Sequence, residues 1–161
     1  MYNIKTASID VTYRCNLRCK HCFNFSGVPR RKEMTDKELR NLAEEISKLS
    51  IDSVCLCGGE TLYRYELMCE MCQIIKKNSP QTLVNLVSNG ILLTKEKAIN
   101  LKRAGFFMVQ VSLDGFIDES YDAVRQSNGQ LSKVFEGINN AIEAGLEVSI
   151  ATLPHKKSLY E

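Results

Sequence analysis

The sequence predicts an α/β protein built on a parallel sheet, and three observations support this fold class. Short apolar or β-branched segments alternate with longer segments in which apolar residues recur every three or four positions. Glycine, asparagine and serine residues break the chain between these segments. The residues with unusual chemistry all follow predicted strands directly, where parallel strands would bring them to one rim. Alternating strands and helices form an open doubly wound sheet or a barrel, and the last observation favours a barrel.

Length and composition describe one globular domain over residues 1–161, with 44% hydrophobic and 25% charged residues. The formal net charge of +2, without a long block of either sign, gives no reason to expect a nucleic-acid or anionic membrane partner. The chain has no signal-peptide pattern and no apolar run long enough to span a bilayer. We therefore expect a cytoplasmic protein. Seven cysteines in a reducing compartment indicate metal binding or catalysis more than disulfides.

The first predicted strand, residues 7–12, alternates apolar and polar side chains and leads into a polar loop that runs to about Arg31. Thr35 and Glu38 then have the spacing of a capping box. Apolar residues continue at helical spacing to Ser50, so the first helix follows this loop.

The remaining elements repeat this order. The later segments with strand character are 53–57, 82–87, 106–113 and 146–152. Four later segments have helical periodicity: 65–77, the segment capped by Thr94 and ended by Gly105, 118–125, and 131–144. The chain stops after the fifth strand, where another helix would begin.

Three cysteines, Cys15, Cys19 and Cys22, form a C-x3-C-x2-C pattern in the loop after the first strand. They offer three soft ligands, one short of a closed four-cysteine site. Zinc with His21 as fourth ligand is one alternative, but neighbouring ligands rarely reach two corners of a tetrahedron and structural zinc prefers C-x2-C pairs. Unliganded core thiols are another, although the loop is polar. An iron-sulfur cube would use three thiolates and leave its fourth iron open.

The segment from Cys15 to Phe23 resembles the cluster loop of the radical S-adenosylmethionine (SAM) superfamily, and later motifs follow in the right order. The resemblance implies a partial parallel (β/α)6 barrel, truncated here after the fifth strand. It implies that Cys15, Cys19 and Cys22 ligate a 4Fe-4S cluster whose fourth iron binds SAM. An electron from a flavodoxin- or ferredoxin-like donor would then cleave SAM to methionine and a 5′-deoxyadenosyl radical, which abstracts hydrogen from a substrate.

The resemblance also implies contacts with SAM. Phe23 is similar to the position that contacts adenine. Gly58, Gly59 and Glu60 resemble the motif on which the methionine amino group rests, although Thr61 stands where the family usually has proline. Glycines let the backbone approach a ligand, and a glutamate can accept hydrogen bonds from an ammonium group.

Three residues further along complete this expected SAM site. Ser88 and Ser112 match family positions that reach the ribose or methionine part of SAM. The segment 111–115, with Arg125 downstream, is similar to members of the SPASM type that modify peptides and proteins, in which the arginine pairs with the SAM carboxylate. The resemblance therefore implies a peptide or protein side chain as substrate. The Asp-Gly pair within 111–115 is also a common turn.

The other cysteines have a simpler interpretation. Cys55 and Cys57 share one face of a strand, and Cys69 and Cys72 lie on a helix, so we expect all four to pack as small core residues. His155 follows the last strand and is expected in a loop.

Two alternatives to a radical SAM enzyme stay open. A truncated or degenerate domain would bind a cluster, or merely fold, without turnover. A zinc-binding interaction module would carry a colourless metal, whereas an iron-sulfur cube absorbs visible light.

Overall fold

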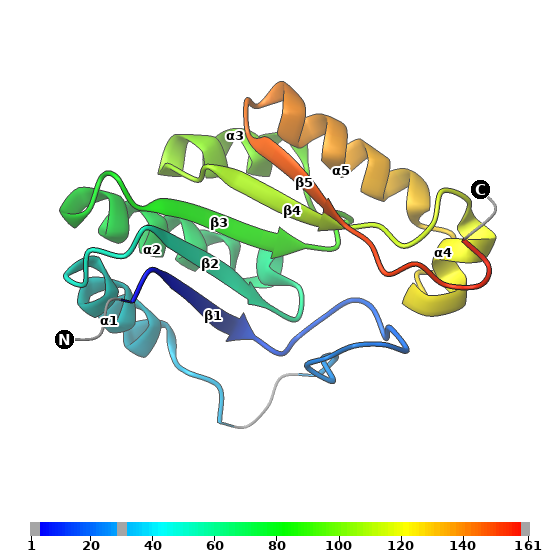
Figure 1. Cartoon of the computed structure of the whole chain (residues 1–161), viewed down its shortest axis with the longest axis horizontal. Helices are drawn as coiled ribbons and strands as arrows, with labels where there is room; N and C mark the ends of the chain where they lie inside the picture. Colours follow the sequence, from blue (N-terminus) through cyan, green and yellow to red (C-terminus); the bar gives the residue numbers. More distant parts are fainter. Residues whose placement is uncertain (1–3, 29–31, 159–161) are drawn as a thin grey trace.

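The computed structural model describes residues 4–28 and 32–158 (Figure 1). Five strands form one sheet in the order β1-β2-β3-β4-β5, and every neighbouring pair is parallel. The strands are β1 Thr6–Thr12, β2 Ser53–Gly58, β3 Leu83–Ser88, β4 Met108–Ser112 and β5 Glu147–Ala151. The helices are α1 Asp36–Ser47, the 3-10 helix η1 Thr61–Arg64, α2 Tyr65–Asn78, α3 Lys95–Ala104, α4 Asp118–Arg125 and α5 Leu131–Glu143. Each strand and helix expected from the sequence is therefore present.

The boundaries differ from the prediction at a few places. The capping box of Thr35 and Glu38 is formed, but α1 ends at Ser47 because Ser50 has a left-handed φ of 50° that an α-helix cannot continue through. The 3-10 helix η1 was not expected. It begins where the Glu60 side chain accepts a hydrogen bond from a backbone N–H of its first turn. The predicted end of the cysteine loop, near Arg31, lies outside the described residues.

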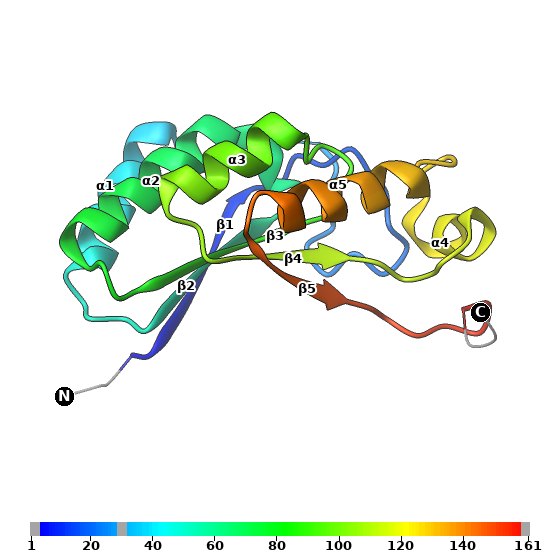
Figure 2. The same cartoon turned by 90° about the horizontal axis from the view of Figure 1, so that it is seen from above.

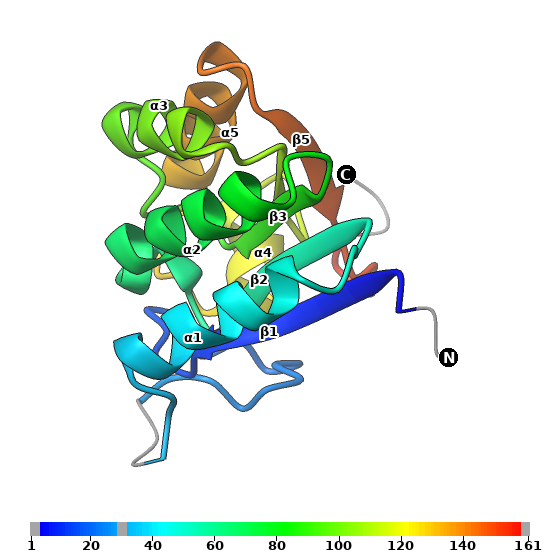
Figure 3. The ribbon, with the colours of Figure 1, turned by 90° about the vertical axis from the view of Figure 1, so that its left-hand side faces the viewer.

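The helices α1, α2, α3 and α5 cover one face of the sheet, as Figures 2 and 3 show from two directions. The apolar core lies in this layer and joins strand residues such as Leu56 and Val109 to helix residues such as Met68 and Leu101. A doubly wound sheet would carry helices on both faces. Sequential strand order with helices on one side is instead the arrangement of a partial barrel. In the described residues no helix has the length and apolar character needed to cross a bilayer.

The opposite face of the sheet is open and largely polar. Alternation along the strands buries Leu56 and Leu86 under the helices and leaves Cys57 and Asn85 half-buried on the other side. Gln110 of β4 lies on the same open face. A barrel directs this face towards its interior, so these polar residues line the space into which the carboxyl ends of the strands open.

The cysteines outside the loop separate into two pairs. Cys72 is fully buried in the core and Cys69 packs against it, which confirms the prediction for this pair. The prediction is wrong for Cys55 and Cys57, which lie half-buried on the open face, where no helix covers them. The Cys57 thiol donates to Asp10 Oδ1 of the neighbouring strand at 3.3 Å.

Candidate functional site

A cavity of about 230 Å³ lies at the carboxyl ends of the strands, and most of the expected site residues line it. Loop residues from after β1 meet residues from the ends of β2, β3 and β4 and from the end of α4, on the side where the arrowheads point in Figure 1. The expected residues in its wall are Cys15, Cys19, Cys22, Phe23, Gly58, Gly59, Ser88, Ser112 and Arg125. The fold therefore brings distant segments together as the strand ends indicated.

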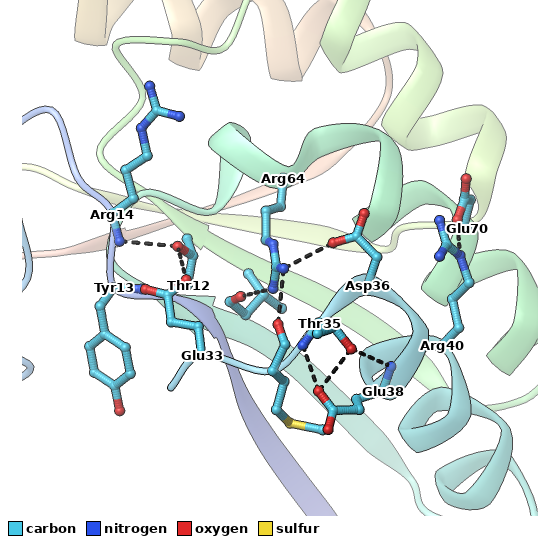
Figure 4. A network of polar contacts seen from close by, with 12 residues as sticks. Thr12, Tyr13, Arg14, Glu33, Thr35, Asp36, Glu38, Arg40, Arg64 and Glu70 are labelled. Carbon is cyan, nitrogen blue, oxygen red and sulfur yellow. Dashed lines mark hydrogen bonds and ion pairs between the residues drawn. The ribbon is translucent and has the colours of Figure 1, made fainter. Parts of the chain in front are cut away.

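Polar contacts fasten both ends of the cysteine loop (Figure 4). The Thr12 hydroxyl, at the end of β1, donates to a carboxylate oxygen of Glu33 at 3.0 Å. The Arg64 guanidinium donates to the carbonyl of Val11 before the loop, at 2.6 Å, and to the carbonyl of Met34 after it, at 2.9 Å. These contacts fix the base of the loop against η1, so the position of the cysteines does not depend on the loop alone.

Within the loop, backbone N–H groups point at two of the three sulfur atoms. Leu17 N–H donates to Cys15 Sγ at 3.4 Å, and Ser26 N–H donates to Cys22 Sγ at 3.2 Å. Burial raises the pKa of the Cys15 and Cys19 thiols above their ordinary value. A bound metal would oppose this shift, because coordination deprotonates a thiol.

The two glycines at the end of β2 are required by backbone packing. The N–H of Gly59 donates to Thr12 O at 2.7 Å, and the N–H of Glu60 donates to Arg14 O at 2.8 Å. A Cβ on Gly58 would collide with the carbonyl oxygen of Thr12, and a Cβ on Gly59 would collide with that of Arg14. Gly58 also has a φ of +128°, which other residues rarely adopt. The glycines therefore let β2 clamp the start of the cysteine loop, in addition to any approach to a ligand.

The Glu60 side chain lies behind the cavity wall. Its carboxylate is fully buried, outside the cavity wall, and accepts hydrogen bonds from Ser88 Oγ at 2.8 Å, Asn89 N at 2.8 Å and Leu62 N at 3.0 Å. Burial raises the pKa of Glu60 despite these three donors. Beside it, the Thr61 hydroxyl donates to a main-chain carbonyl of β3 at 2.8 Å. The carboxylate thus joins η1 to the end of β3.

The Arg125 side chain reaches the cysteine loop from the end of α4. Its Nε donates to Asp114 Oδ2 at 2.6 Å, and its Nη1 lies 4.0 Å from Cys19 Sγ. The Cys19 thiol donates to the Arg125 carbonyl at 3.7 Å, and the N–H of Lys20 donates to the Val124 carbonyl at 2.8 Å. The last turn of α4 is therefore docked on the loop next to one of the cysteines.

Sequence reasoning missed two asparagines at the cavity. Asn89 lines the wall, and its Nδ2 donates to Asn16 Oδ1 at 2.7 Å and lies 4.0 Å from Cys15 Sγ. The sequence offered only a weak signal, because Asn89 belongs to a strand-ending triplet that is typical of turns. The pair links the end of β3 to the cysteine loop.

His21 does not turn towards the three cysteines as a zinc site would require. Its Nε2 lies 3.2 Å from Asp114 Oδ2. Among residues 4–28 and 32–158, no group of three or more His, Cys, Asp or Glu side chains is arranged around a single metal ion. A cube differs in this respect, because each thiolate binds a different iron atom.

Solved structures resemble most of this fold. A structure described as "Native anSMEcpe with bound AdoMet" has a TM-score of 0.75 at 22% identity, covering 91% of this chain and 43% of its own. One described as "Crystal structure of methylornithine synthase (PylB)" has a TM-score of 0.71 at 18% identity, covering 91% of this chain and 44% of its own. At these identities the likeness supports the fold alone, and this chain matches less than half of each solved chain.

Sequence relatives are closer. A GTP 3′,8-cyclase of Peptoclostridium acidaminophilum is 37% identical over 141 residues, which is 86% of this chain and 42% of the relative. A probable GTP 3′,8-cyclase of Methanocella arvoryzae is 30% identical over 158 residues, which is 98% of this chain and 50% of the relative. The chain thus spans half or less of these relatives. Residues 9–158 match the family described as "Radical SAM superfamily". The chain belongs to this superfamily, whose members are enzymes that use a 4Fe-4S cluster and SAM.

Proposed function

We propose that residues 1–161 form the core of a radical SAM enzyme, in which Cys15, Cys19 and Cys22 hold the cluster and the surrounding strand ends hold SAM. The observation that carries the proposal is the single cavity in which the three thiols meet the ends of three strands and of α4. When bound and reduced, the cluster and SAM supply a 5′-deoxyadenosyl radical that abstracts a hydrogen atom from a substrate.

The donor set fits a cube better than a single ion. Three thiols on one loop suit three irons of a 4Fe-4S cluster and leave the fourth iron open to a ligand. Two of the sulfur atoms already accept hydrogen bonds from backbone N–H groups of the loop. The N–H donors would also help to hold the loop around the cluster's sulfur ligands.

The walls of the cavity provide partners for the parts of SAM. Arg125 supplies the cation for its carboxylate, while the backbone of Gly58 and Gly59 lies open to the amino group. Phe23 is 93% exposed at the edge of the cavity, where its ring can stack on adenine. Ser112 lines the cavity and would offer its hydroxyl to the ribose or methionine part, whereas Ser88 lines it with a hydroxyl that already donates to Glu60. Glu60 acts indirectly here, since its buried carboxylate fixes Ser88 and the end of β3.

The substrate we propose is a purine nucleotide of the GTP type, in place of the peptide or protein side chain that the sequence resemblance implied. The support is the names of the curated relatives, which include GTP 3′,8-cyclases and molybdenum cofactor biosynthesis protein 1 of Bos taurus, 33% identical over 85% of this chain and 22% of the relative. The open face of the sheet carries Asp10, Asn85 and Gln110, which can hydrogen bond to a polar base or sugar.

Anaerobic reconstitution tests the core of this proposal. The protein would be loaded with iron and sulfide, reduced with dithionite in place of a flavodoxin- or ferredoxin-like donor, and incubated with SAM. We expect 5′-deoxyadenosine, measured by chromatography and mass spectrometry, and its loss in Cys15→Ala. Cys69→Ala is the matched control, because Cys69 lies on α2 away from the cysteine loop and the open face, so its loss should leave the product unchanged.

The other outcomes separate the alternatives. A brown, iron-loaded protein without product would support a cluster-binding domain that does not turn over, and a colourless protein that takes up zinc would refute the cluster assignment. Parallel incubations with GTP and with a peptide mixture test the substrate class. Consumption of GTP with deuterium transfer into 5′-deoxyadenosine from deuterated GTP would support a nucleotide, and transfer only from peptide would refute it.

A further inference from the structure

We propose that Asp114 is the positioning residue of this site: its carboxylate holds Arg125 beside Cys19 and ties the cysteine loop to the sheet through His21. Neither the sequence, where Asp114 reads as a turn residue, nor the cavity wall singles it out, because its side chain is fully buried behind the cavity. The inference rests on the proposed role of Arg125 as a partner of the SAM carboxylate.

The Asp114 carboxylate receives donors from three separate segments. Oδ2 accepts Arg125 Nε at 2.6 Å from the end of α4, and it lies 3.2 Å from His21 Nε2 in the cysteine loop. Oδ1 accepts the N–H of Leu153, which follows β5, at 2.7 Å. The Asp114 carbonyl lies 3.0 Å from His155 Nε2. One side chain at the end of β4 therefore connects the loop after β1, the end of α4 and the segment after β5.

The chemistry of this position requires a carboxylate. The Arg125 side chain is only 13% exposed, so its charge needs a nearby counter-charge. An amide at position 114 would have one acceptor oxygen for three donors, and its NH2 group would face a guanidinium or an N–H. The turn after Asp114 packs closely on the first turn of α4, where a Cβ on Gly115 would collide with the Ser120 side chain.

Two contacts connect the Asp114–Arg125 ion pair to the expected binding sites of the cluster and SAM. The Asp114 pair leaves the outer part of the Arg125 guanidinium directed at the cavity, with Nη1 4.0 Å from Cys19 Sγ. The same end of α4 accepts the Lys20 N–H through the Val124 carbonyl at 2.8 Å. Loss of Asp114 should therefore free the arginine and loosen the loop where it touches α4.

The first test measures SAM affinity of the reconstituted protein by equilibrium dialysis with labelled SAM. We expect Asp114→Asn to raise the Kd for SAM about tenfold, because it removes a charge-assisted hydrogen bond that orients Arg125. Glu119→Gln is the matched control: Glu119 lies on the same helix as Arg125 and pairs with Lys157 at the exposed surface, so the Kd for SAM should stay unchanged. In an Arg125→Gln background, Asp114→Asn should change the Kd by less than about twofold if it acts through the arginine.

The second test uses the cluster-free protein and needs no cofactor. Amide hydrogen exchange read by NMR should become roughly tenfold faster at Lys20, whose N–H crosses to α4, in Asp114→Asn. Exchange at Gly27, whose N–H bonds to Tyr13 O within the loop base, should stay unchanged. If Asp114→Asn alone does not fold, the Lys20 exchange rate is compared between Arg125→Gln and the variant that carries both substitutions. The double variant leaves no unpaired buried charge.

The outcomes distinguish the two proposals. Unchanged SAM affinity together with unchanged Lys20 exchange would overturn the positioning role, and equal losses in the wild-type and Arg125→Gln backgrounds would overturn the route through Arg125. Wild-type protein that binds neither cluster nor SAM would overturn the proposed function, and the exchange rates would then still decide whether Asp114 holds the loop.

Discussion

Replacing Gly59 with alanine tests the idea that the glycine pair exists to clamp the cysteine loop. Gly59 does not have a positive φ, so the alanine backbone is not strained there and only the new Cβ matters. That Cβ would collide with the carbonyl oxygen of Arg14, a backbone atom that cannot rotate away. Ordinary contact begins near 3.4 Å, so the end of β2 and the loop must separate by about 1 Å.

The separation removes two hydrogen bonds. The N–H of Gly59 to Thr12 O, at 2.7 Å, and the N–H of Glu60 to Arg14 O, at 2.8 Å, both span the gap that must open. At about 1 kcal/mol for each net hydrogen bond, Gly59→Ala should cost about 2 kcal/mol of unfolding free energy. The matched control is Gly27→Ala, whose Cβ would meet the end of the Arg18 side chain and no backbone atom; because a side-chain end can shift, this change should cost less than about 1 kcal/mol.

Urea unfolding of the cluster-free protein, followed by far-UV circular dichroism, measures the difference. For an m-value of about 2 kcal/mol/M, Gly59→Ala should lower the midpoint by about 1 M. Its iron content after reconstitution should also fall, because the displaced Arg14 is next to the first cysteine. Equal midpoints for Gly59→Ala and Gly27→Ala would refute the clamp.

Three further predictions follow from the described contacts. Cys19→Ala should reduce iron and sulfide retention to that of unreconstituted protein, because two thiolates cannot hold three irons, and full retention would contradict the ligand assignment. Burial raises the pKa of Glu60 above its ordinary 4.5, so the stability this group contributes is complete below that value and is lost as the pH rises through the folded pKa. Urea midpoints of wild type should therefore fall relative to those of Glu60→Gln as the pH increases, and parallel curves would contradict this. Iodoacetamide at neutral pH should modify Cys55 before Cys72, as followed by mass spectrometry. Burial raises the pKa of Cys72 to about 12, whereas hydrogen bonding from Cys57 lowers the pKa of Cys55. Equal rates of modification would argue against this difference.

Much of the fold was predictable because its signals are local. Capping residues such as Thr35 and Thr94 fix where helices begin, and the left-handed Gly105 fixes where one ends. The 3-10 helix escaped prediction because its N-terminal cap is the buried side chain of Glu60, which also bonds to a different strand. The side of the sheet on which Cys55 and Cys57 lie was not predictable either. Period-2 alternation groups residues on one face without saying which face the helices cover.

The sequence by itself determined the kind of chemistry: the spacing of Cys15, Cys19 and Cys22, and the appearance of glycine, serine and aspartate after successive strands. Parallel strands order such segments along one rim whatever their detailed packing, so the location of the site followed from the strand pattern. Only the tertiary structure decided which polar groups face the cavity and which support it. Glu60 and Asp114 turned out to be buried supports, because some of their partners, such as Ser88 for Glu60 and His21 for Asp114, are far away in the sequence and are brought close only when the sheet forms.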